Sequence, residues 1–104
     1  MEIARVRALA RREARFLRRV FTPAEIRYCA GKRKAWQHYA VRFAAKEAVW
    51  KALGMGAIAL REIEVGRSGD GRPFVLLRGR PAPWVQLSLS HSDDYAAAVA
   101  LCLK

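Results

Sequence analysis

The 104-residue chain is short of acidic residues, of cysteine and of long apolar runs, and each shortage limits what the protein can do. Nine acidic side chains stand against 20 lysines and arginines, so the formal net charge is +11 and we expect an anionic partner. Two cysteines, Cys29 and Cys102, are too few for a disulfide framework or a zinc site, and we expect reduced thiols in the cytoplasm. No run reaches the roughly 20 apolar residues of a membrane helix, and the N-terminal stretch lacks a signal-peptide core, so we expect no membrane partner.

The length and the order of hydrophobic patterns predict one small domain that spans residues 1–104. The composition, 53% hydrophobic and 28% charged, is typical of a globular protein with a single modest core. Helical periodicity comes first and strand-like alternation follows. We expect helices at about 2–20, 22–31 and 33–53, and strands around 63–65, 74–77, 85–90 and 95–103. Helices followed by strands predict an α+β fold, with N-terminal helices packed on an antiparallel sheet.

Two local signals support these boundaries. Thr22 can cap a helix, Pro23 suits its first turn, and Glu25 can reach back to the cap. Ser68-Gly69-Asp70-Gly71 has the composition of a hairpin turn. We therefore expect a helix to begin after Thr22 and two strands to pair across residues 68–71.

Residues 42–54 form the most informative segment. Good helix formers fill it, and Gly54 marks its end. Alanines and valines make one apolar arc while Phe43 and Trp50 lie roughly opposite, so we expect this helix to be buried on two sides. Glu47 and Lys51, four residues apart, share one stripe. A charge on such a helix must be paired, bound to a metal or open to a cleft. The alternative is a simple Glu–Lys pair that supports an exposed helix.

This segment resembles the W/F-x-x-K-E-A-x-x-K signature of the 4'-phosphopantetheinyl transferases. It matches the form R-F-A-A-K-E-A-x-x-K-A-x-G, which is common among the holo-acyl-carrier-protein synthases. Residues 15–25 resemble the family's R-F-x-x-R-x-[FL]-T-x-x-E segment, and Gly71-Arg72-Pro73 resembles its G-[KR]-P turn. Residues 88–98 resemble its ending, V-S-[IL]-[ST]-H-[ST]-x-x-Y-A-x-A. The four segments follow the family's order over nearly the whole chain.

The resemblance implies an enzyme that transfers the phosphopantetheine arm of coenzyme A to a serine of an acyl carrier protein, with magnesium. Adenosine 3',5'-bisphosphate is the other product. Glu47 is then the metal carboxylate and a catalytic residue, and Lys51 is a second catalytic residue that faces the same phosphates. The residues implied for coenzyme A are Arg42, Arg33, Arg72, Pro73, Ser90 and His91.

The resemblance also implies two protein contacts. Acyl carrier proteins are acidic, and the positions that match the family's carrier-docking cations are Arg5, Arg15 and Arg19. Short members of the family usually form trimers with sites between subunits, so we expect a homotrimer. In that arrangement one chain supplies residues 42–51 to a site, and its neighbour supplies residues 71–73 with Ser90 and His91, or the reverse.

The family pattern begins with a strand that carries G-x-D, whose aspartate is a second metal carboxylate. Aligned on Glu2, that aspartate falls upstream of Met1. We expect a longer protein with an aspartate three residues before Glu2. The alternative is a short paralogue that binds coenzyme A or the carrier without catalysis. A nucleic-acid-binding protein is supported by charge alone, because no nucleic-acid motif appears and the aromatic residues follow core periodicity. We therefore expect no nucleic-acid partner.

Overall fold

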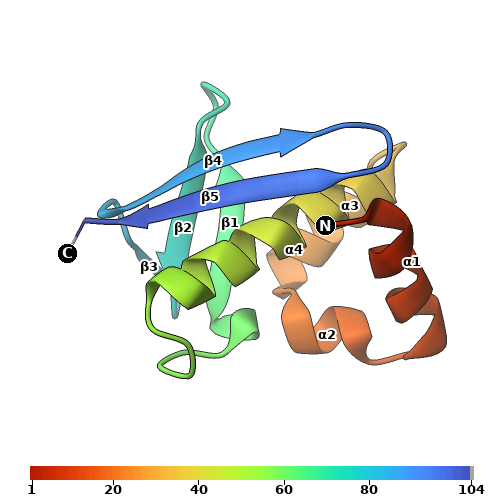
Figure 1. Ribbon diagram of the computed structural model, residues 1–104, viewed down its shortest axis with the longest axis horizontal. Helices are drawn as coiled ribbons and strands as arrows, with labels where there is room; N and C mark the ends of the chain where they lie inside the picture. Colours follow the sequence, from red (N-terminus) through yellow and green to blue (C-terminus); the bar gives the residue numbers. More distant parts are fainter. Residues whose placement is uncertain (104) are drawn as a thin grey trace.

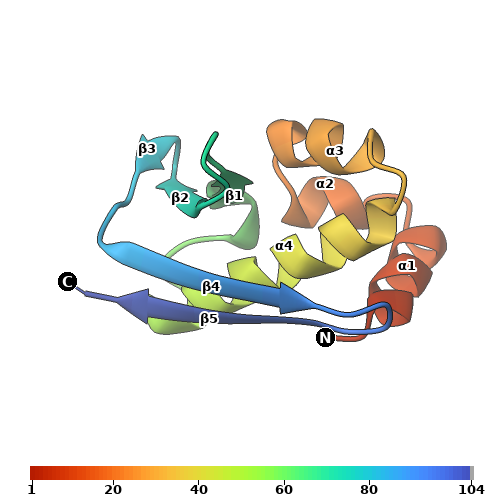
Figure 2. The same cartoon turned by 90° about the horizontal axis from the view of Figure 1, so that it is seen from above.

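The computed structural model describes residues 1–103 and confirms the α+β order. One long helix, α4, runs through the middle of the molecule (Figure 1). The β4–β5 ribbon covers one side of α4, and the other helices and the β1–β3 sheet lie at its two ends (Figure 2). The elements are α1 (Ile3–Arg12), α2 (Phe16–Val20), α3 (Pro23–Ala30), α4 (Ala35–Ala52), the 3-10 turn η1 (Leu60–Glu62), β1 (Ile63–Arg67), β2 (Pro73–Leu77), β3 (Arg80–Pro81), β4 (Val85–His91) and β5 (Ala96–Cys102).

All strand pairs are antiparallel, as expected, but they form two sheets instead of one. The first sheet has the order β1-β2-β3, with Val65 opposite Val75 in its middle. The second is the β4–β5 ribbon, in which Ser88 lies opposite Val99. The break follows Pro81, and Pro83 in the connection has no N–H to donate to a continuing ladder.

The prediction of a single helix over 2–20 was wrong. α1 ends at Arg12, Glu13 is extended, and α2 begins at Phe16. A straight helix of that length would be about 28 Å long and would carry its last turn away from the small core. The break instead turns Phe16 inward, where its ring makes edge contacts with Phe21 at 6.5 Å and with Phe43 at 5.6 Å. Burial of these rings outweighs the helical preference of the intervening residues.

The predicted start of α3 and the two-sided burial of α4 are both confirmed. Thr22 Oγ1 accepts a hydrogen bond from the Glu25 backbone at 3.2 Å, and the Glu25 carboxylate accepts one from Thr22 N at 2.9 Å. α4 gives Tyr39 and Ala40 to the core formed with α1, α2 and α3, and it gives Val49 to the core beneath the sheets. This helix therefore joins the two halves of the molecule.

Candidate functional site

A buried ion pair fixes α4 against its neighbours. Lys46 has no exposed surface, and its Nζ donates a hydrogen bond of 2.5 Å to Glu25 Oε1 of α3. The other carboxylate oxygen accepts a 2.8 Å hydrogen bond from Val65 N of β1. Burial lowers the pKa of Lys46, and the attraction of Glu25 opposes that shift. One carboxylate thus ties three elements together and sets which face of α4 points outward.

The residue that follows Lys46 is the predicted metal ligand Glu47. Glu47 is half-buried and Lys51 is exposed. Within residues 1–103 neither side chain forms an ion pair, so the simple Glu–Lys pair expected as an alternative is not made. A carboxylate without a protein partner, on a helix whose rotation is fixed, is available to a cation.

A group of cations surrounds the ring of Tyr28 at the other end of α4. The Arg42 guanidinium lies 4.1 Å from the centre of that ring, and Lys32 Nζ lies 4.5 Å from it. His38 meets the same ring edge-on, at 5.7 Å between centroids. Two cations on one aromatic ring are held by its quadrupole, and they leave a strongly positive surface.

Arg42 is the centre of this group and is only 4% exposed. Its Nε is the one buried side-chain nitrogen or oxygen within residues 1–103 that has no hydrogen-bond partner. Arg42 also lines a cavity of about 180 Å³, together with Tyr28, Arg67 and Phe74 and with the carboxylates of Glu25 and Glu64. Glu25 is already bound to Lys46 and Glu64 to Thr22, so neither carboxylate serves Arg42 Nε. A buried N–H left unpaired costs about 1–3 kcal/mol, so Arg42 favours an added acceptor.

The pKa values of two groups, His38 and Cys29, are shifted by burial and by the positive charge of this region. The pKa of His38 is lowered, first by burial and then by repulsion from Arg42, Lys32, His91 and Arg67. The pKa of the buried Cys29 thiol is raised to about 11, mainly by burial, while the neighbouring Arg42 opposes the shift. The predicted coenzyme A residues Arg42 and His91 both contribute to lowering the pKa of His38, and Arg42 also shares the ring of Tyr28 with it. We call the group Tyr28, Lys32, His38, Arg42, Arg67 and His91 the Tyr28 cluster.

The other predicted coenzyme A residues lie elsewhere. Arg33 precedes α4, is exposed and lines a separate hollow of about 430 Å³. Arg72 and Pro73 follow the β1–β2 turn, where Arg72 pairs with Asp70 at 3.3 Å, and both line a cleft of about 590 Å³. That turn points away from the C-terminal half of α4 (Figure 1). Ser90 is exposed at the end of β4, next to His91.

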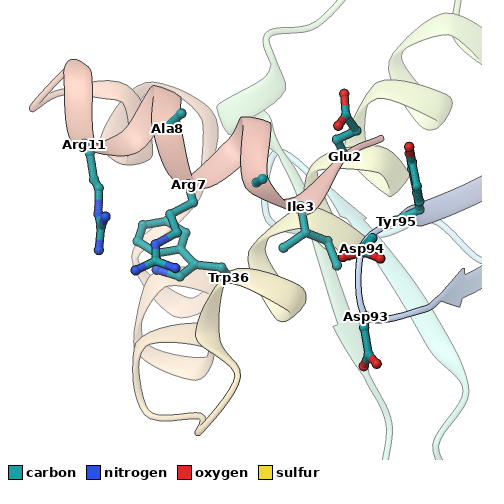
Figure 3. A pocket seen from close by; sticks show the side chains of 10 residues that line it. Glu2, Ile3, Arg7, Ala8, Arg11, Trp36, Asp93, Asp94 and Tyr95 are labelled. Atoms are coloured by element: carbon teal, nitrogen blue, oxygen red, sulfur yellow. The ribbon is translucent and has the colours of Figure 1, made fainter.

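A cleft of about 690 Å³ lies between α1 and the β4–β5 turn. Arg7 and Arg11 project side by side from α1 at one end, while Asp93 and Asp94 lie at the other (Figure 3). Opposite charges at its two ends make this cleft a poor site for a polyanion. None of the predicted site residues lines it, so we place the chemistry on α4.

The predicted carrier-docking residues are all exposed. Arg5 lies on α1, Arg15 is the residue before α2, and Arg19 is in the last turn of α2. None of the three is in an ion pair within residues 1–103. Their charge is thus free for an acidic partner.

Comparison with known proteins identifies the family. Residues 1–100 match the family model of the 4'-phosphopantetheinyl transferase superfamily. The chain belongs to this superfamily. A holo-[acyl-carrier-protein] synthase of Moorella thermoacetica is 44% identical over 97% of this chain and 87% of its own length. The corresponding enzyme of Koribacter versatilis is 42% identical over 94% and 88%.

Solved structures of this superfamily have the same fold. The holo-(acyl-carrier-protein) synthase of Bacillus anthracis, in complex with CoA (3',5'-ADP), gives a TM-score of 0.81 at 30% identity, over 96% of this chain and 87% of that one. The enzyme of Helicobacter pylori, in complex with coenzyme A, gives 0.80 at 28% identity, over 97% and 93%. The resemblance first seen in four segments thus extends to the whole three-dimensional arrangement.

The donor set of this superfamily member fits a magnesium ion only with help from a substrate. Within residues 1–103 no three histidine, cysteine or acidic side chains gather as a metal cluster, and Glu47 stands alone on its face of α4. Magnesium is commonly held by one or two carboxylates together with phosphate oxygens and water. The same described region contains no helix with the length and apolar character needed to cross a membrane.

Proposed function

We propose that this chain transfers the 4'-phosphopantetheine group of coenzyme A to a serine of an apo-acyl carrier protein. The observation that carries the proposal is the unpaired Glu47 carboxylate on α4, inside the family's signature and five residues after the buried Arg42. Its relatives carry the name holo-[acyl-carrier-protein] synthase, and two related structures hold coenzyme A or its adenosine part.

Each part of the site has a role in this transfer. The serine oxygen forms a bond to the phosphorus of the phosphopantetheine arm, and the pyrophosphate bond breaks to release adenosine 3',5'-bisphosphate. A magnesium ion bound at Glu47 would neutralise the pyrophosphate charge. Lys51 lies one turn further on the same stripe and adds an ammonium group for the same phosphates.

The Tyr28 cluster suits the phosphates of the coenzyme A nucleotide. Arg42 brings a buried donor that lacks an acceptor, and Arg67 lines the same cavity. Lys32 adds charge at the ring of Tyr28, which also lines that cavity. His91, which follows Ser90, extends this surface at the end of β4. Arginine forks are well matched to phosphate oxygens, so we assign this cluster to the phosphates of the nucleotide end.

The exposed cations of α1 and α2 suit the carrier. Acyl carrier proteins are acidic, and the exposed Arg5, Arg15 and Arg19 would attract and orient such a partner. We propose the reducing cytoplasm, where cysteine side chains remain thiols, as the compartment of this reaction.

We also propose that the chain works as a homotrimer. On the outer face of β5, Val99 is 68% exposed and Leu101 is 55% exposed, and Tyr95 and Leu103 continue the same exposed face. An apolar strip of this kind is usually covered by a partner. We propose that one chain supplies residues 42–51 to each site and that its neighbour supplies the Gly71-Arg72-Pro73 turn, or the reverse. A monomeric mass in solution at full activity would contradict this assembly.

The transfer itself is tested by the intact mass of an apo-carrier incubated with this chain, coenzyme A and magnesium. We expect the carrier to gain one phosphopantetheine arm and to gain nothing when a chelator removes the metal. The alternative is a non-catalytic carrier or coenzyme A binder. Binding of both partners without any mass increase would support that alternative.

A further inference from the structure

A second group of cations lies apart from the Tyr28 cluster, where α2, α3 and η1 meet. Arg18 of α2, Arg27 of α3 and Arg61 of η1 line a hollow of about 410 Å³. The remaining lining residues are Phe21, Pro23 and Ile26, which form its apolar floor. These arginines are far apart in the sequence, and only the fold brings them around one hollow. We call it the three-arginine hollow.

The three arginines lack partners in the described part of the chain. None of them forms an ion pair or a side-chain hydrogen bond within residues 1–103, whereas Arg72 and Arg78 each pair with a carboxylate. Like charges gathered around one hollow repel each other. An anionic surface placed over the hollow would relieve that repulsion.

The chemistry of the hollow favours a protein surface over a small anion. All three arginines are exposed, so a lone phosphate would stay in contact with water and gain little. Three guanidinium groups can instead bind several carboxylates of one folded partner at once, and the apolar floor can take a side chain between them. Arg18 and Arg19 both lie on α2, and Arg15 immediately precedes that helix, so the hollow adjoins cations that we assign to carrier docking.

We propose that the three-arginine hollow is a second contact surface for the acidic acyl carrier protein, separate from Arg5, Arg15 and Arg19. The identity of the partner rests on the proposed function. With this hollow the basic surface extends from α2 onto α3 and η1. A carrier protein that places acidic residues at the hollow should bind more tightly than one that does not.

The test is the affinity for a carrier whose acceptor serine is replaced by alanine, measured by calorimetry at two salt concentrations. The variants are Arg27→Gln, Arg61→Gln and the double variant. Arg80→Gln is the matched control, because Arg80 is exposed on β3 and has no ion pair within residues 1–103. We expect each single change to weaken carrier binding about twofold to fivefold, and the double change to weaken it further and flatten the salt dependence. Arg80→Gln should bind like the wild type.

Several outcomes would overturn the proposal. A double variant that binds the carrier like the wild type would contradict it, and so would an equal loss of coenzyme A binding, which would assign the hollow to the nucleotide. If Arg27→Gln disturbs α3, the exposed Arg61→Gln decides alone. If the wild type transfers phosphopantetheine and the variants bind the carrier with unchanged affinity, this inference is wrong while the proposed function stands. A wild type that binds the carrier but transfers nothing contradicts the proposed function and leaves the comparison of variants valid.

Discussion

The ammonium group of Lys46 lies 2.5 Å from the carboxylate of Glu25, and both side chains are almost entirely shielded from water. Glu25 also caps α3 through Thr22 N and accepts the hydrogen bond of Val65 N. These contacts hold α4 against α3 and β1. Because Glu47 is the next residue along α4, the buried pair also determines where the proposed metal carboxylate stands.

We predict that Lys46→Met will destabilise the fold strongly, because it leaves the Glu25 carboxylate buried without its cation. Breaking a buried pair in this way costs roughly 3–5 kcal/mol. For a domain of this size that loss lowers the melting temperature by on the order of 12 °C or more. Lys51→Met is the matched control, since it makes the same change at an exposed position of the same helix. Similar melting temperatures for the two variants would show that the pair does not anchor α4.

We predict that coenzyme A binding tightens as the pH falls from 8 toward 6, because the bound phosphates favour the charged form of His38 and raise its pKa. In the free protein burial and the nearby Arg42, Lys32, His91 and Arg67 hold that pKa below 6.5. Binding therefore takes up a proton, and His38→Gln should reduce the effect by up to about tenfold in affinity. Calorimetry of both proteins in two buffers measures the uptake. The titration of coenzyme A itself is the same in the two experiments. An equal pH dependence of coenzyme A affinity in the wild type and in His38→Gln would therefore show that His38 is not the group that takes up the proton.

The lowered pKa of His38 also makes the free energy of unfolding depend on pH. The unfolded chain binds a proton at His38 more readily than the folded chain, so folding stability should be complete above pH 6.5 and should decline as the pH falls toward the lower folded value. His38→Gln should remove that part of the decline in a denaturant titration at pH 7.5 and pH 5.5. A steeper decline in the variant would contradict the sign.

We predict that reversing Arg15 and Arg19 to glutamate weakens carrier use mainly through the association rate. Both are exposed cations that attract an acidic partner over a distance, and this attraction is screened by salt. Stopped-flow association with the carrier should slow and lose most of its salt dependence, while coenzyme A binding stays the same. If both ligands weaken equally, α2 serves the nucleotide or the fold.

A fourth set of expectations concerns the strand that the family places before Glu2. Glu2 forms an antiparallel bridge with Tyr95, and Ala96 N donates to Met1 O at 2.8 Å. Continued upstream, this register sets the residue three before Glu2 opposite Ala98, which packs against the core cluster that includes Val49 of α4. An aspartate there would lie on the side of the ribbon that faces α4, the helix that carries Glu47.

We therefore predict that a chain extended upstream by a strand with this aspartate binds magnesium more tightly, turns over faster and melts at a higher temperature. Two carboxylates compensate a divalent ion better than one, and the added strand pairs with a free edge of β5. In the extended chain, replacing this aspartate by asparagine should leave the raised melting temperature unchanged and should abolish the tighter magnesium binding and the faster turnover. Equal magnesium-dependent turnover by the 104-residue chain would show that the second carboxylate is dispensable.

Much of the fold could be predicted because local chemistry specifies it. The capping box at Thr22 and Glu25, the turn at residues 68–71 and the two-sided apolar pattern of α4 each depend on near neighbours in the sequence. The break between α1 and α2 could not, because it depends on the packing of Phe16 against Phe43, which is distant in the chain.

The same limit applies to the site. The sequence predicts that Glu25 caps α3, which accounts for an acidic residue at this position. Nothing in the sequence shows that Glu25 also binds Lys46, 21 residues away. The Tyr28 cluster was found only in part: Arg42 and His91 came from the family pattern, whereas Lys32, His38 and Arg67 gather through tertiary contacts. The four-residue spacing of His38 and Arg42, which share one stripe of α4, is a local signal for that cluster.

The central claim is that Glu47 holds the metal for phosphopantetheine transfer, and Glu47→Gln tests it most directly. The side chain is half-buried and unpaired within residues 1–103, so the amide should leave the melting temperature nearly unchanged. In the most active form of the chain we expect a loss of turnover of about 100-fold or more, measured by the mass of the modified carrier. Coenzyme A should still bind through the Tyr28 cluster. Transfer at the wild-type rate by a folded Glu47→Gln protein would contradict this account.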